Sequence, residues 1–221
     1  MPETVTVATF NIHHGEGRDG RVDLERVAAA IEATSADLIA LQEIDRNLSR
    51  SGRVDQVTEL ERLTGLSIRF HPTLERGDGD YGIGLAAREP LEARFEGLPR
   101  AGGEEPRGAI VASWRDVSVI ATHLSRDRRA RRSQLTWIEG AVPRRGSALV
   151  LGDLNQSWRK LAGLRARGFM AARPDGAGGP LKRQIDHVLV GPGLFVVASR
   201  FVSSEASDHV PLVAEVALLH G

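Results

Sequence analysis

The sequence contains no cysteine, which excludes structural disulfides, thiolate nucleophiles and cysteine-containing zinc sites. It also has no apolar run close to the ~18 residues that a membrane-spanning helix requires. The first residues do not show the basic segment followed by an apolar segment that marks a signal peptide. These absences favour a reducing compartment, and we expect a cytoplasmic protein that does not insert stably into a membrane.

Net charge and aromatic residues are also scarce. The chain has 29 acidic and 29 basic residues, so its formal net charge at pH 7 is zero, and aromatic residues make up only 5%. Enzymes that act on duplex DNA need a wide basic surface, and often apolar wedges that hold a distorted helix. The composition therefore argues mildly against a dedicated duplex-DNA enzyme, although local patches of charge can still form.

What is present is ordinary for a soluble globular protein, with 221 residues of which 41% are hydrophobic and 26% charged. A chain of this length can bury a sizeable core. Neither a repeat nor a linker divides it, so we predict a single domain over residues 1–221.

Strand-like and helical segments alternate along the chain. Apolar and β-branched runs predict strands over residues 5–11, 38–43, 82–87, 109–114, 117–122, 148–151, 185–190, 195–202 and 210–217. Helical spacing of apolar residues predicts helices over residues 23–34, 56–64, 128–140 and 158–167. The longest irregular connections are expected near residues 71–80 and 173–180. Hairpins mixed with strand–helix–strand units indicate an α/β fold with mixed sheets.

Polar residues recur at one kind of place, the ends of the predicted strands. In open α/β sheets ligands bind at strand ends, and a composite hydrolytic site needs carboxylate, amide and imidazole groups from several segments. The residues at these strand ends are Asn11, Glu43, His123, Asp153, Asn155, Asp186, Asp208 and His209.

The residue types suit metal-assisted hydrolysis of a phosphoester. Mg²⁺ prefers hard oxygen ligands and keeps several waters, so Glu43 and Asn11 fit its needs. The reaction also needs an in-line water, a group that takes its proton, and donors for the developing charge. Asp153 fits the activation of water, and His209, held by Asp208, fits donation to the phosphoryl oxygens.

Seven motifs strengthen this interpretation by their order. They are TFNIHHG (residues 9–15), LQEID (41–45), YGIGLAAR (81–88), THL (122–124), GDLN (152–155), QIDHVLV (184–190) and SDHVPL (207–212). Together they resemble the motifs of the endonuclease/exonuclease/phosphatase superfamily over nearly the whole chain. The resemblance implies the DNase I-like fold, a four-layer α/β sandwich with two packed mixed β-sheets and a site at one edge.

The resemblance also implies roles for residues near the metal and the attacking water. It implies that Glu43 is the main metal ligand with Asn11 beside it. Asp153 looks like the residue that activates water, and Asn155 looks like its partner on the phosphate or on a second metal.

For the phosphate side of the site, the resemblance implies a second set of roles. Asp208 looks like the residue that orients His209. His123 looks like the phosphate-contacting histidine, and Asp186 like the carboxylate that pairs with a histidine in many members. Tyr81 looks like the tyrosine that some members place near the scissile phosphate.

One position departs from the pattern of relatives that repair abasic DNA. These relatives usually carry aspartate two residues after the asparagine of the first motif, where this chain has His13, followed by His14. The difference weakens the interpretation as an abasic-site enzyme. Metal ligation, phosphate contact and simple exposure in a loop all stay open for the two histidines.

Several residues have structural alternatives. Asp153 could be the N-cap of the helix that follows it. Arg107 could face the substrate or lie in an exposed loop, and the arginine-rich residues 126–132 could form a solvated helix face or a surface for a phosphate-rich partner.

We predict a Mg²⁺-dependent hydrolase of phosphodiesters or phosphomonoesters, in which Mn²⁺ can replace Mg²⁺. The preferred substrate is a small or lipid-headgroup phosphoester, because the charge and aromatic content do not favour duplex DNA. The alternative is a nuclease that acts on DNA or RNA. A phosphate-binding module that has lost catalysis is the remaining class, and the presence of all the catalytic residue types argues against it.

Overall fold

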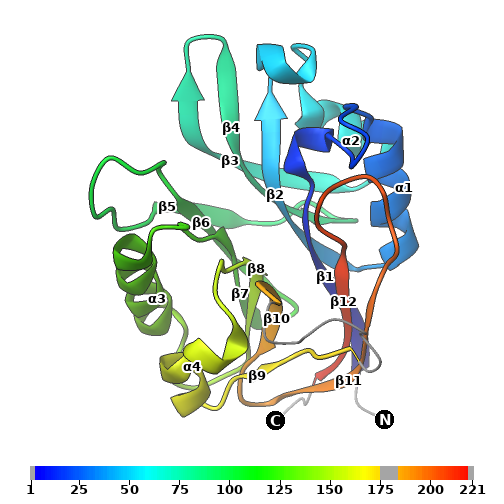
Figure 1. Ribbon diagram of the computed structural model, residues 1–221. Coiled ribbons are helices and arrows are strands. Elements are labelled where there is room, and N and C mark those ends of the chain that lie inside the picture. The colour runs from blue at the N-terminus through cyan, green and yellow to red at the C-terminus, as the bar shows by residue number, and fades with distance from the viewer. Residues whose placement is uncertain (1–2, 175–183, 219–221) are drawn as a thin grey trace.

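The computed structural model describes residues 3–174 and 184–218 and consists of two six-stranded β-sheets with helices on their outer faces (Figure 1). The strand order is β11-β12-β1-β2-β4-β3 in one sheet and β5-β6-β7-β8-β10-β9 in the other. Each sheet contains one parallel pair, β1 with β2 and β7 with β8, and antiparallel neighbours around it. The sheets are therefore mixed, as the sequence predicts.

The first sheet is built from the two ends of the chain and the segments that follow α1. Its strands are β1 (Glu3–Asn11), β2 (Leu38–Arg46), β3 (Ser67–Arg76), β4 (Gly79–Ala87), β11 (Leu194–Phe201) and β12 (Leu212–Leu218). The second sheet takes its strands from the middle of the chain. They are β5 (Ala93–Gly97), β6 (Gly108–Trp114), β7 (Val117–His123), β8 (Ala148–Asp153), β9 (Met170–Ala171) and β10 (Asp186–Val190).

The helices connect the strands, and the three longest of the described helices begin at aspartate caps. They are α1 (Leu24–Thr34), α2 (Gln56–Thr64), α3 (Arg128–Ala141) and α4 (Ala162–Ala166), with the 3-10 turns η1 (His13–Gly15), η2 (Ser49–Ser51) and η3 (Trp158–Lys160). Asp23, Asp55 and Asp127 each accept a hydrogen bond from the first turn of the helix that follows. None of the helices in the described part of the chain is both long and apolar enough to cross a membrane.

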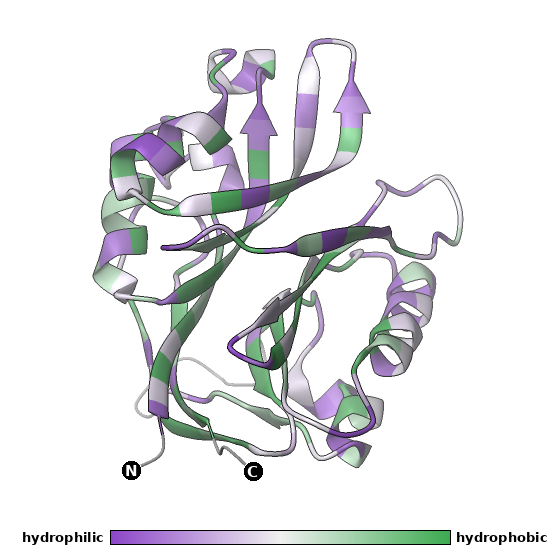
Figure 2. Cartoon of the chain, turned by 180° about the vertical axis from the view of Figure 1, so that it is seen from behind, coloured by the Kyte–Doolittle hydropathy of each residue, from purple (hydrophilic) through white to green (hydrophobic). Residues whose placement is uncertain are grey.

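Three hydrophobic cores lie between four layers of helices and sheets. One core lies between the sheets and includes Val7, Leu85, Val119 and Leu151. A second core lies between the first sheet and helices α1 and α2, and a third lies between the second sheet and helices α3 and α4. Figure 2 shows hydrophobic residues along the inner parts of the strands and hydrophilic residues on the helices and at the projecting strand ends. The order helix, sheet, sheet, helix confirms the predicted four-layer sandwich.

Three strands were absent from the sequence prediction. The connection expected to be irregular near residues 71–80 is instead most of a hairpin, with β3 ending at Arg76 and β4 starting at Gly79. The short strands β5 and β9 were also missed, and the helix predicted over residues 158–167 is divided into η3 and α4. The loop predicted over residues 173–180 lies mostly outside the described residues.

Candidate active site

The predicted polar residues meet at one end of the two sheets because of strand direction and register. Asn11 ends β1, and β2 runs parallel to it and brings Glu43 alongside. In the second sheet, His123, Asp153 and Asp186 are neighbours across β7, β8 and β10. A strand-to-strand ladder thus places three titratable side chains in one row.

Gly152 is required by the close approach of β7 and β8 beside this row. Its φ is +147°, and a Cβ atom there would lie only 1.9 Å from the carbonyl oxygen of Thr122. A larger residue would push the strands apart. The glycine of the GDLN motif therefore keeps Asp153 in register with His123.

Glu43 leaves the regular ladder of β2. The pairing of β2 with β4 shifts register between Gln42 and Ile44, so Glu43 lies on a β-bulge, and its φ is +61°. A non-glycine residue in this region costs about 1–3 kcal/mol, and such strain is common at functional sites. The bulge releases the Glu43 side chain from the sheet face and into the pocket at the strand ends.

Asn11 ties the two sheets together through its side-chain amide. Its Nδ2 donates to Oε1 of Glu43 at 2.9 Å and to Oδ2 of Asp153 at 3.4 Å, while its Oδ1 accepts from the backbone amide of His13 at 3.0 Å. An amide oxygen has two lone pairs, so Oδ1 can accept from His13 and still bind a metal, and the metal-ligand role of Asn11 stays a prediction. The amide nitrogen faces both carboxylates, so Asn11 also holds Glu43 and Asp153 in position.

The partner of His209 is Asp186, which corrects the expectation that Asp208 orients this ring. His209 Nδ1 lies 2.8 Å from Asp186 Oδ2. The side chain of Asp208 is 62% exposed, lies 4.0 Å from Nδ1 of His13, and accepts from the hydroxyl of Ser207 at 3.3 Å. Asp208 therefore faces the mouth of the pocket, and β10 supplies the carboxylate that holds the imidazole.

Electrostatics keep His209 protonated. Burial alone would lower the pKa of His209, but the hydrogen bond to Asp186 and the negative charges of Asp186, Asp153 and Asp208 raise it to about 9. The ring is therefore a cation at neutral pH, with Nδ1–H donated to Asp186. Its Nε2 is directed toward Asp153, with Oδ2 3.9 Å away.

At Asp153 the environment favours the neutral form, because burial disfavours the carboxylate anion. Burial and the nearby charge of Asp186 raise the pKa of Asp153 to about 7, against the backbone amide of Asn155, which donates to its Oδ1 at 2.8 Å. A carboxylate with a pKa near neutral pH is suited to accept a proton. The N-cap alternative does not apply, since the N-cap residues of η3 and α4 are Ser157 and Leu161.

His123 is buried and neutral, with partners on both ring nitrogens. Its Nδ1 lies 3.2 Å from Nη1 of Arg107, and its Nε2 lies 3.4 Å from Oδ2 of Asp153. Burial, followed by the positive charge of Arg107, holds the pKa of His123 well below its usual value. Because an arginine can only donate, Nδ1 accepts and Nε2–H points to Asp153. His123 thus contacts the predicted base and also lines the pocket, and its contact with the phosphate stays a prediction.

Arg107 lies next to His123 in the lining of the pocket. Its side chain is only 9% exposed and pairs with Glu105 at 3.1 Å, and its Nη1 also lies 3.4 Å from the hydroxyl of Tyr81. Burial raises the pKa of Tyr81, so its hydroxyl stays protonated. Tyr81 and Arg107 both line the pocket, so Arg107 lies in the candidate site and not in an exposed loop away from it.

Asn155 lies at the rim of the same pocket in a left-handed conformation, with φ of +47°. Its Nδ2 donates to the carbonyl of Leu124 at 2.9 Å and lies 3.2 Å from Nε2 of His123. Since Nε2 of His123 carries a hydrogen, the bond to Leu124 is the one that fixes the amide. The Asn155 side-chain oxygen makes no hydrogen bond with the described residues, and the residue lines the pocket.

The resulting pocket has a volume of about 400 Å³ and a strongly polar lining. Arginines come from both sheets and from the loops between them. They are Arg50, Arg76, Arg107 and Arg126. The sequence interpretation considered only Arg107 and Arg126, because Arg76 reaches the pocket on the hairpin that was not predicted and Arg50 follows β2 in η2.

The arginine-rich start of α3 does not form one continuous face toward this pocket. Arg131 turns inward, where its Nη1 donates to the carbonyls of Ser125 at 2.7 Å and Arg126 at 2.8 Å. Arg128 and Arg132 line a separate hollow that includes α4. Of residues 126–132, Arg126 alone lines the pocket with Asp153 and His209.

The residues of the pocket fit a divalent metal. Glu43 and Asp153 line the pocket, and Asp186 lies beside Asp153 on β10 with its Oδ1 buried and without a hydrogen-bond partner among the described residues. Asp153, Asp186 and His209 place potential ligand atoms within 4.8 Å of one another, as do His13, His14 and Glu43. A hard cation with carboxylate and water ligands would offset this charge.

Comparison with known proteins gives a consistent result. The chain matches the model of the Endonuclease/Exonuclease/phosphatase family over residues 8–209. Its structure resembles an endonuclease/exonuclease/phosphatase from Beutenbergia cavernae DSM 12333 with a TM-score of 0.82 and 24% identity, covering 98% of this chain and 72% of that chain. No curated protein matches the chain in sequence.

More distant structures share the fold. A mannosyl-6-phosphatase from Bacteroides thetaiotaomicron VPI-5482 has a TM-score of 0.74 and 16% identity, covering 97% of this chain and 100% of that chain. An AP endonuclease from Archaeoglobus fulgidus has a TM-score of 0.65 and 20% identity, covering 95% and 98%. The sandwich architecture and the family match agree with the motifs of the sequence. This chain therefore belongs to the endonuclease/exonuclease/phosphatase family and is a phosphoester hydrolase.

Proposed function

We propose that the protein is a Mg²⁺-dependent hydrolase of a small or lipid-headgroup phosphoester that carries additional negative charge. The observation that supports this proposal is the pocket of about 400 Å³, in which arginine side chains surround Glu43, Asp153 and His209. Pockets of this size suit small ligands. A bound Mg²⁺ would supply Lewis-acid stabilisation of the phosphoryl oxygens, and Glu43 would hold it.

Asp153 takes the proton from the attacking water. Its raised pKa of about 7 gives it proton affinity at neutral pH, and its contacts hold it in place. Asn11 Nδ2 and the neutral ring of His123 both face Oδ2, while the backbone amide of Asn155 donates to Oδ1. This set of donors fixes the orientation of the carboxylate toward the water.

His209 acts as the cationic donor to the phosphoryl group. Its pKa of about 9 keeps it protonated, and the hydrogen bond from Nδ1 to Asp186 leaves Nε2–H free to donate. The charge that develops on the phosphoryl oxygens and on the leaving oxygen is stabilised by a positioned donor of this kind. Asp186 is thus a positioning residue that acts through the imidazole.

The arginines set the preference for a highly charged substrate. Arg107 is held beside Glu105 and Tyr81, whereas Arg76 and Arg126 make no ion pair with any carboxylate among the described residues. Arg76 comes from β3 of the first sheet, and Arg126 follows β7 of the second. Two unpaired guanidinium groups from different sheets suit a second phosphate or carboxylate on the substrate.

A nuclease is the second candidate, since the AP endonuclease from Archaeoglobus fulgidus shares the fold. Two observations favour a small substrate. Arg131 is used internally, and Arg128 and Arg132 line a different hollow, so the arginine run does not extend the basic lining of the pocket. The formal net charge is also zero.

Hydrolysis of a panel of substrates tests the proposal. The panel compares sugar phosphates and inositol phosphates with one or two phosphate groups, short single-stranded DNA and RNA, and an abasic duplex, with Mg²⁺ and with EDTA. We expect kcat/KM to be highest for a small substrate with two phosphates, and activity to be lost with EDTA. The preference for a second phosphate should weaken in Arg126→Gln and persist in Arg145→Gln, a control outside the pocket. Faster cleavage of the abasic duplex, with a steep dependence on salt, would overturn it.

A further inference from the structure

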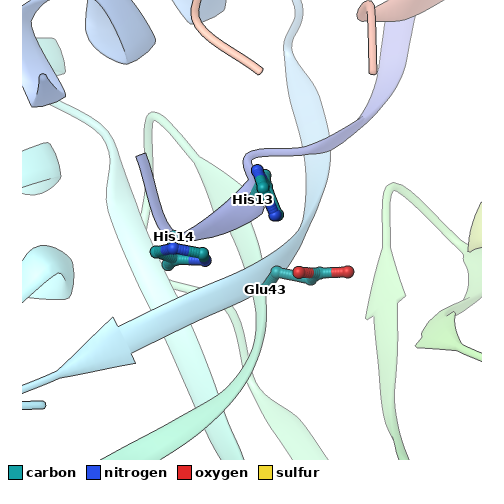
Figure 3. A group of neighbouring side chains, drawn as sticks. All are labelled: His13, His14 and Glu43. Atoms are coloured by element: carbon teal, nitrogen blue, oxygen red, sulfur yellow. The ribbon is translucent and has the colours of Figure 1, made fainter. Parts of the chain in front are cut away.

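The turn after β1 brings two histidines to Glu43, and none of the steps above uses them. One potential ligand atom from each of His13, His14 and Glu43 lies within 4.8 Å of the others. Figure 3 shows both imidazole rings beside the side chain of Glu43, which comes from β2. His13 lines the hydrolytic pocket, while His14 lies behind it and is only 7% exposed.

Glu16 holds one nitrogen of each ring and leaves the other nitrogen free. Nδ1 of His13 lies 3.3 Å from the backbone oxygen of Glu16, and Nε2 of His14 lies 3.5 Å from its carboxylate. A backbone oxygen can only accept, so Nδ1 of His13 carries the hydrogen and Nε2 has a free lone pair. Nδ1 of His14 is buried and has no hydrogen-bond partner among the described residues. Metal-binding histidines usually have this arrangement, in which the other nitrogen donates to a carbonyl or carboxylate.

Gln56 locks the two segments that carry these ligands. Its Nε2 donates to the carbonyl of His14 at 2.7 Å, and its Oε1 accepts from the backbone amide of Asp45 at 2.9 Å. Gln56 is fully buried at the start of α2. The turn with the histidines and the strand with Glu43 are therefore held together by a side chain outside the cluster.

All three candidate ligands have an unusual backbone conformation. The φ angles are +46° for His13, +44° for His14 and +61° for Glu43. Left-handed backbone is uncommon for residues with a Cβ atom, and it re-aims the side chain. Two different segments, a turn and a β-bulge, thus adopt it where the three side chains meet.

The charges around the cluster favour a cation. Glu43 and Glu16 are carboxylates within or against the cluster, and Asp208 lies 4.0 Å from His13. Arg50, the arginine whose charge acts on His14, is paired with Asp45 through contacts of 2.6 Å and 2.8 Å, while Arg76, Arg107 and Arg126 line the pocket beside His13 and Glu43. Three carboxylates therefore lie close to the two imidazole rings.

We propose that His13, His14 and Glu43 bind a first-row transition-metal dication, with Glu16 as the positioning residue for both imidazoles. Two imidazole nitrogens and one carboxylate are the donor set of catalytic zinc and non-haem iron sites, whereas Mg²⁺ prefers oxygen ligands. Glu43 joins this position to the hydrolytic pocket, because its Oε1 accepts from Asn11 and lies 4.0 Å from Nδ1 of His123. The inference rests on the proposed function only in that the two share Glu43.

Spectroscopy of the metal-free protein loaded with a probe ion tests the site without an activity assay. Addition of one equivalent of Co²⁺ should produce visible ligand-field bands, and these should persist in a large excess of Mg²⁺. With Zn²⁺, long-range ¹H–¹⁵N spectra should show shifts at Nε2 of His13 and Nδ1 of His14. The nitrogens of His71, which lies outside the cluster, should not move. Loss of the Co²⁺ bands on addition of Mg²⁺, or unchanged nitrogens with Zn²⁺, would overturn the proposal.

Variants locate the ligands. His13→Asn and His14→Asn are suitable because asparagine tolerates left-handed backbone better than most residues. Glu16→Gln should weaken Zn²⁺ binding by about 10- to 100-fold in calorimetry, and the histidine variants should weaken it further. Glu205→Gln, on an exposed side chain of a neighbouring loop, is the matched control and should bind Zn²⁺ normally. Equal Zn²⁺ affinity in the wild type and in both histidine variants would contradict the assignment, and circular dichroism confirms that each variant is folded.

The two proposals fail separately. If Zn²⁺ shifts the two nitrogens but the panel of small phosphoesters is not hydrolysed, the metal site stands and the proposed substrate class is wrong. If hydrolysis requires Mg²⁺ and neither Co²⁺ nor Zn²⁺ binds at the histidines, the proposed function stands and the transition-metal site is wrong.

Discussion

Two hollows of the sandwich lie at opposite ends of strands β7 and β8, and they differ in kind. The larger one, about 970 Å³, is formed at the starts of these strands by residues such as Asp116, Arg145 and Ser147. The smaller one, about 400 Å³, is formed at their ends by His123 and Asp153. The larger hollow is lined mainly by turn residues. The smaller hollow is lined by residues such as His123 and Asp153, which the pairing of β7 with β8 places side by side.

Strand direction, and not the volume of a hollow, determines where the candidate catalytic residues meet. Both parallel pairs, β1 with β2 and β7 with β8, point their carboxyl ends at the smaller hollow. Asp153 is buried there, His209 is half-buried, and each affects the pKa of the other. In the larger hollow Asp116 is an exposed turn residue, with φ of +61° in the hairpin between β6 and β7. Substitutions at the two ends should therefore have very different effects.

The largest effect is expected for Asp153→Asn. The substitution keeps the shape of the side chain and removes the base, so kcat should fall by about 10²- to 10⁴-fold while the affinity for substrate is retained. Steady-state kinetics and calorimetry with a non-hydrolysed product measure the two quantities. Asp116→Asn in the larger hollow is the control and should keep kcat. A variant of Asp153 that loses affinity but keeps kcat would make this residue a ligand only.

The next effect separates the two aspartates near His209. Asp186→Asn removes the partner of Nδ1 and should lower kcat by about 10²-fold, as for other misplaced donors in a transition state. Asp208→Asn should cost less, since this side chain is exposed and does not hold the ring. A larger loss in Asp208→Asn than in Asp186→Asn would restore the role that its position next to His209 in the sequence suggested.

Stability should depend on pH because His209 binds a proton more tightly in the folded protein. Its pKa is raised from 6.5 to about 9, so the stabilisation is complete below pH 6.5 and is lost as the pH rises through about 9. Urea unfolding of the metal-free protein should therefore give a free energy of unfolding that decreases from pH 7 to pH 9. The slope should be smaller in Asp186→Asn. An unchanged slope in this variant would show that another group titrates.

The smallest effect is expected at the larger hollow. Arg145 is exposed and has no ion pair among the described residues, so Arg145→Gln should change kcat/KM by less than about twofold and stability by less than about 0.5 kcal/mol. Kinetics and urea unfolding measure both. A marked loss of activity would show that the larger hollow contributes to substrate binding.

The sequence predicted regular elements well where local signals agreed with burial. The helix predicted over residues 56–64 was confirmed with the same bounds, because Asp55 caps its start and Gly65 ends it in a left-handed conformation. The strands predicted over residues 109–114 and 117–122 were also confirmed and form a hairpin, and the two residues between them, Arg115 and Asp116, have the positive φ angles of a tight turn. Local turn chemistry is sufficient to fix such features.

Strand β3 was not predictable from local signals. It forms the edge of its sheet, and its residues are mostly half-buried or exposed, so the apolar alternation of a core strand is absent. It also contains Pro72, which usually argues against a strand. The structure accommodates Pro72 at an irregularity in the pairing with β4, between Pro72 and Leu74. Only the tertiary partner makes this segment a strand.

The set of site residues was predicted from strand ends, and their roles remain proposals. What the sequence did not show was which side chains touch. Asp208 is next to His209 in the chain, yet adjacent side chains point in different directions, and Asp186 arrives from another strand. In the same way, Arg50 and Arg76 have no local signal and are brought to the pocket by η2 and β3. Contacts between distant segments are set by topology, which a single sequence does not reveal.

The bulge at Glu43 changes which face of the sheet the following residues of β2 point to. Before it, Leu38 and Ala40 face the core between the sheets, while Ile39 and Leu41 face the helices. In a regular strand, residue 44 would face the other sheet. Ile44 instead faces the helices with Leu41, because the extra residue of the bulge shifts the alternation of side chains by one position. An engineer who copied only a glutamate into the regular strand of another sandwich would place it on a packed face. A design that transfers this carboxylate must therefore also transfer the β-bulge that directs it away from the packed face.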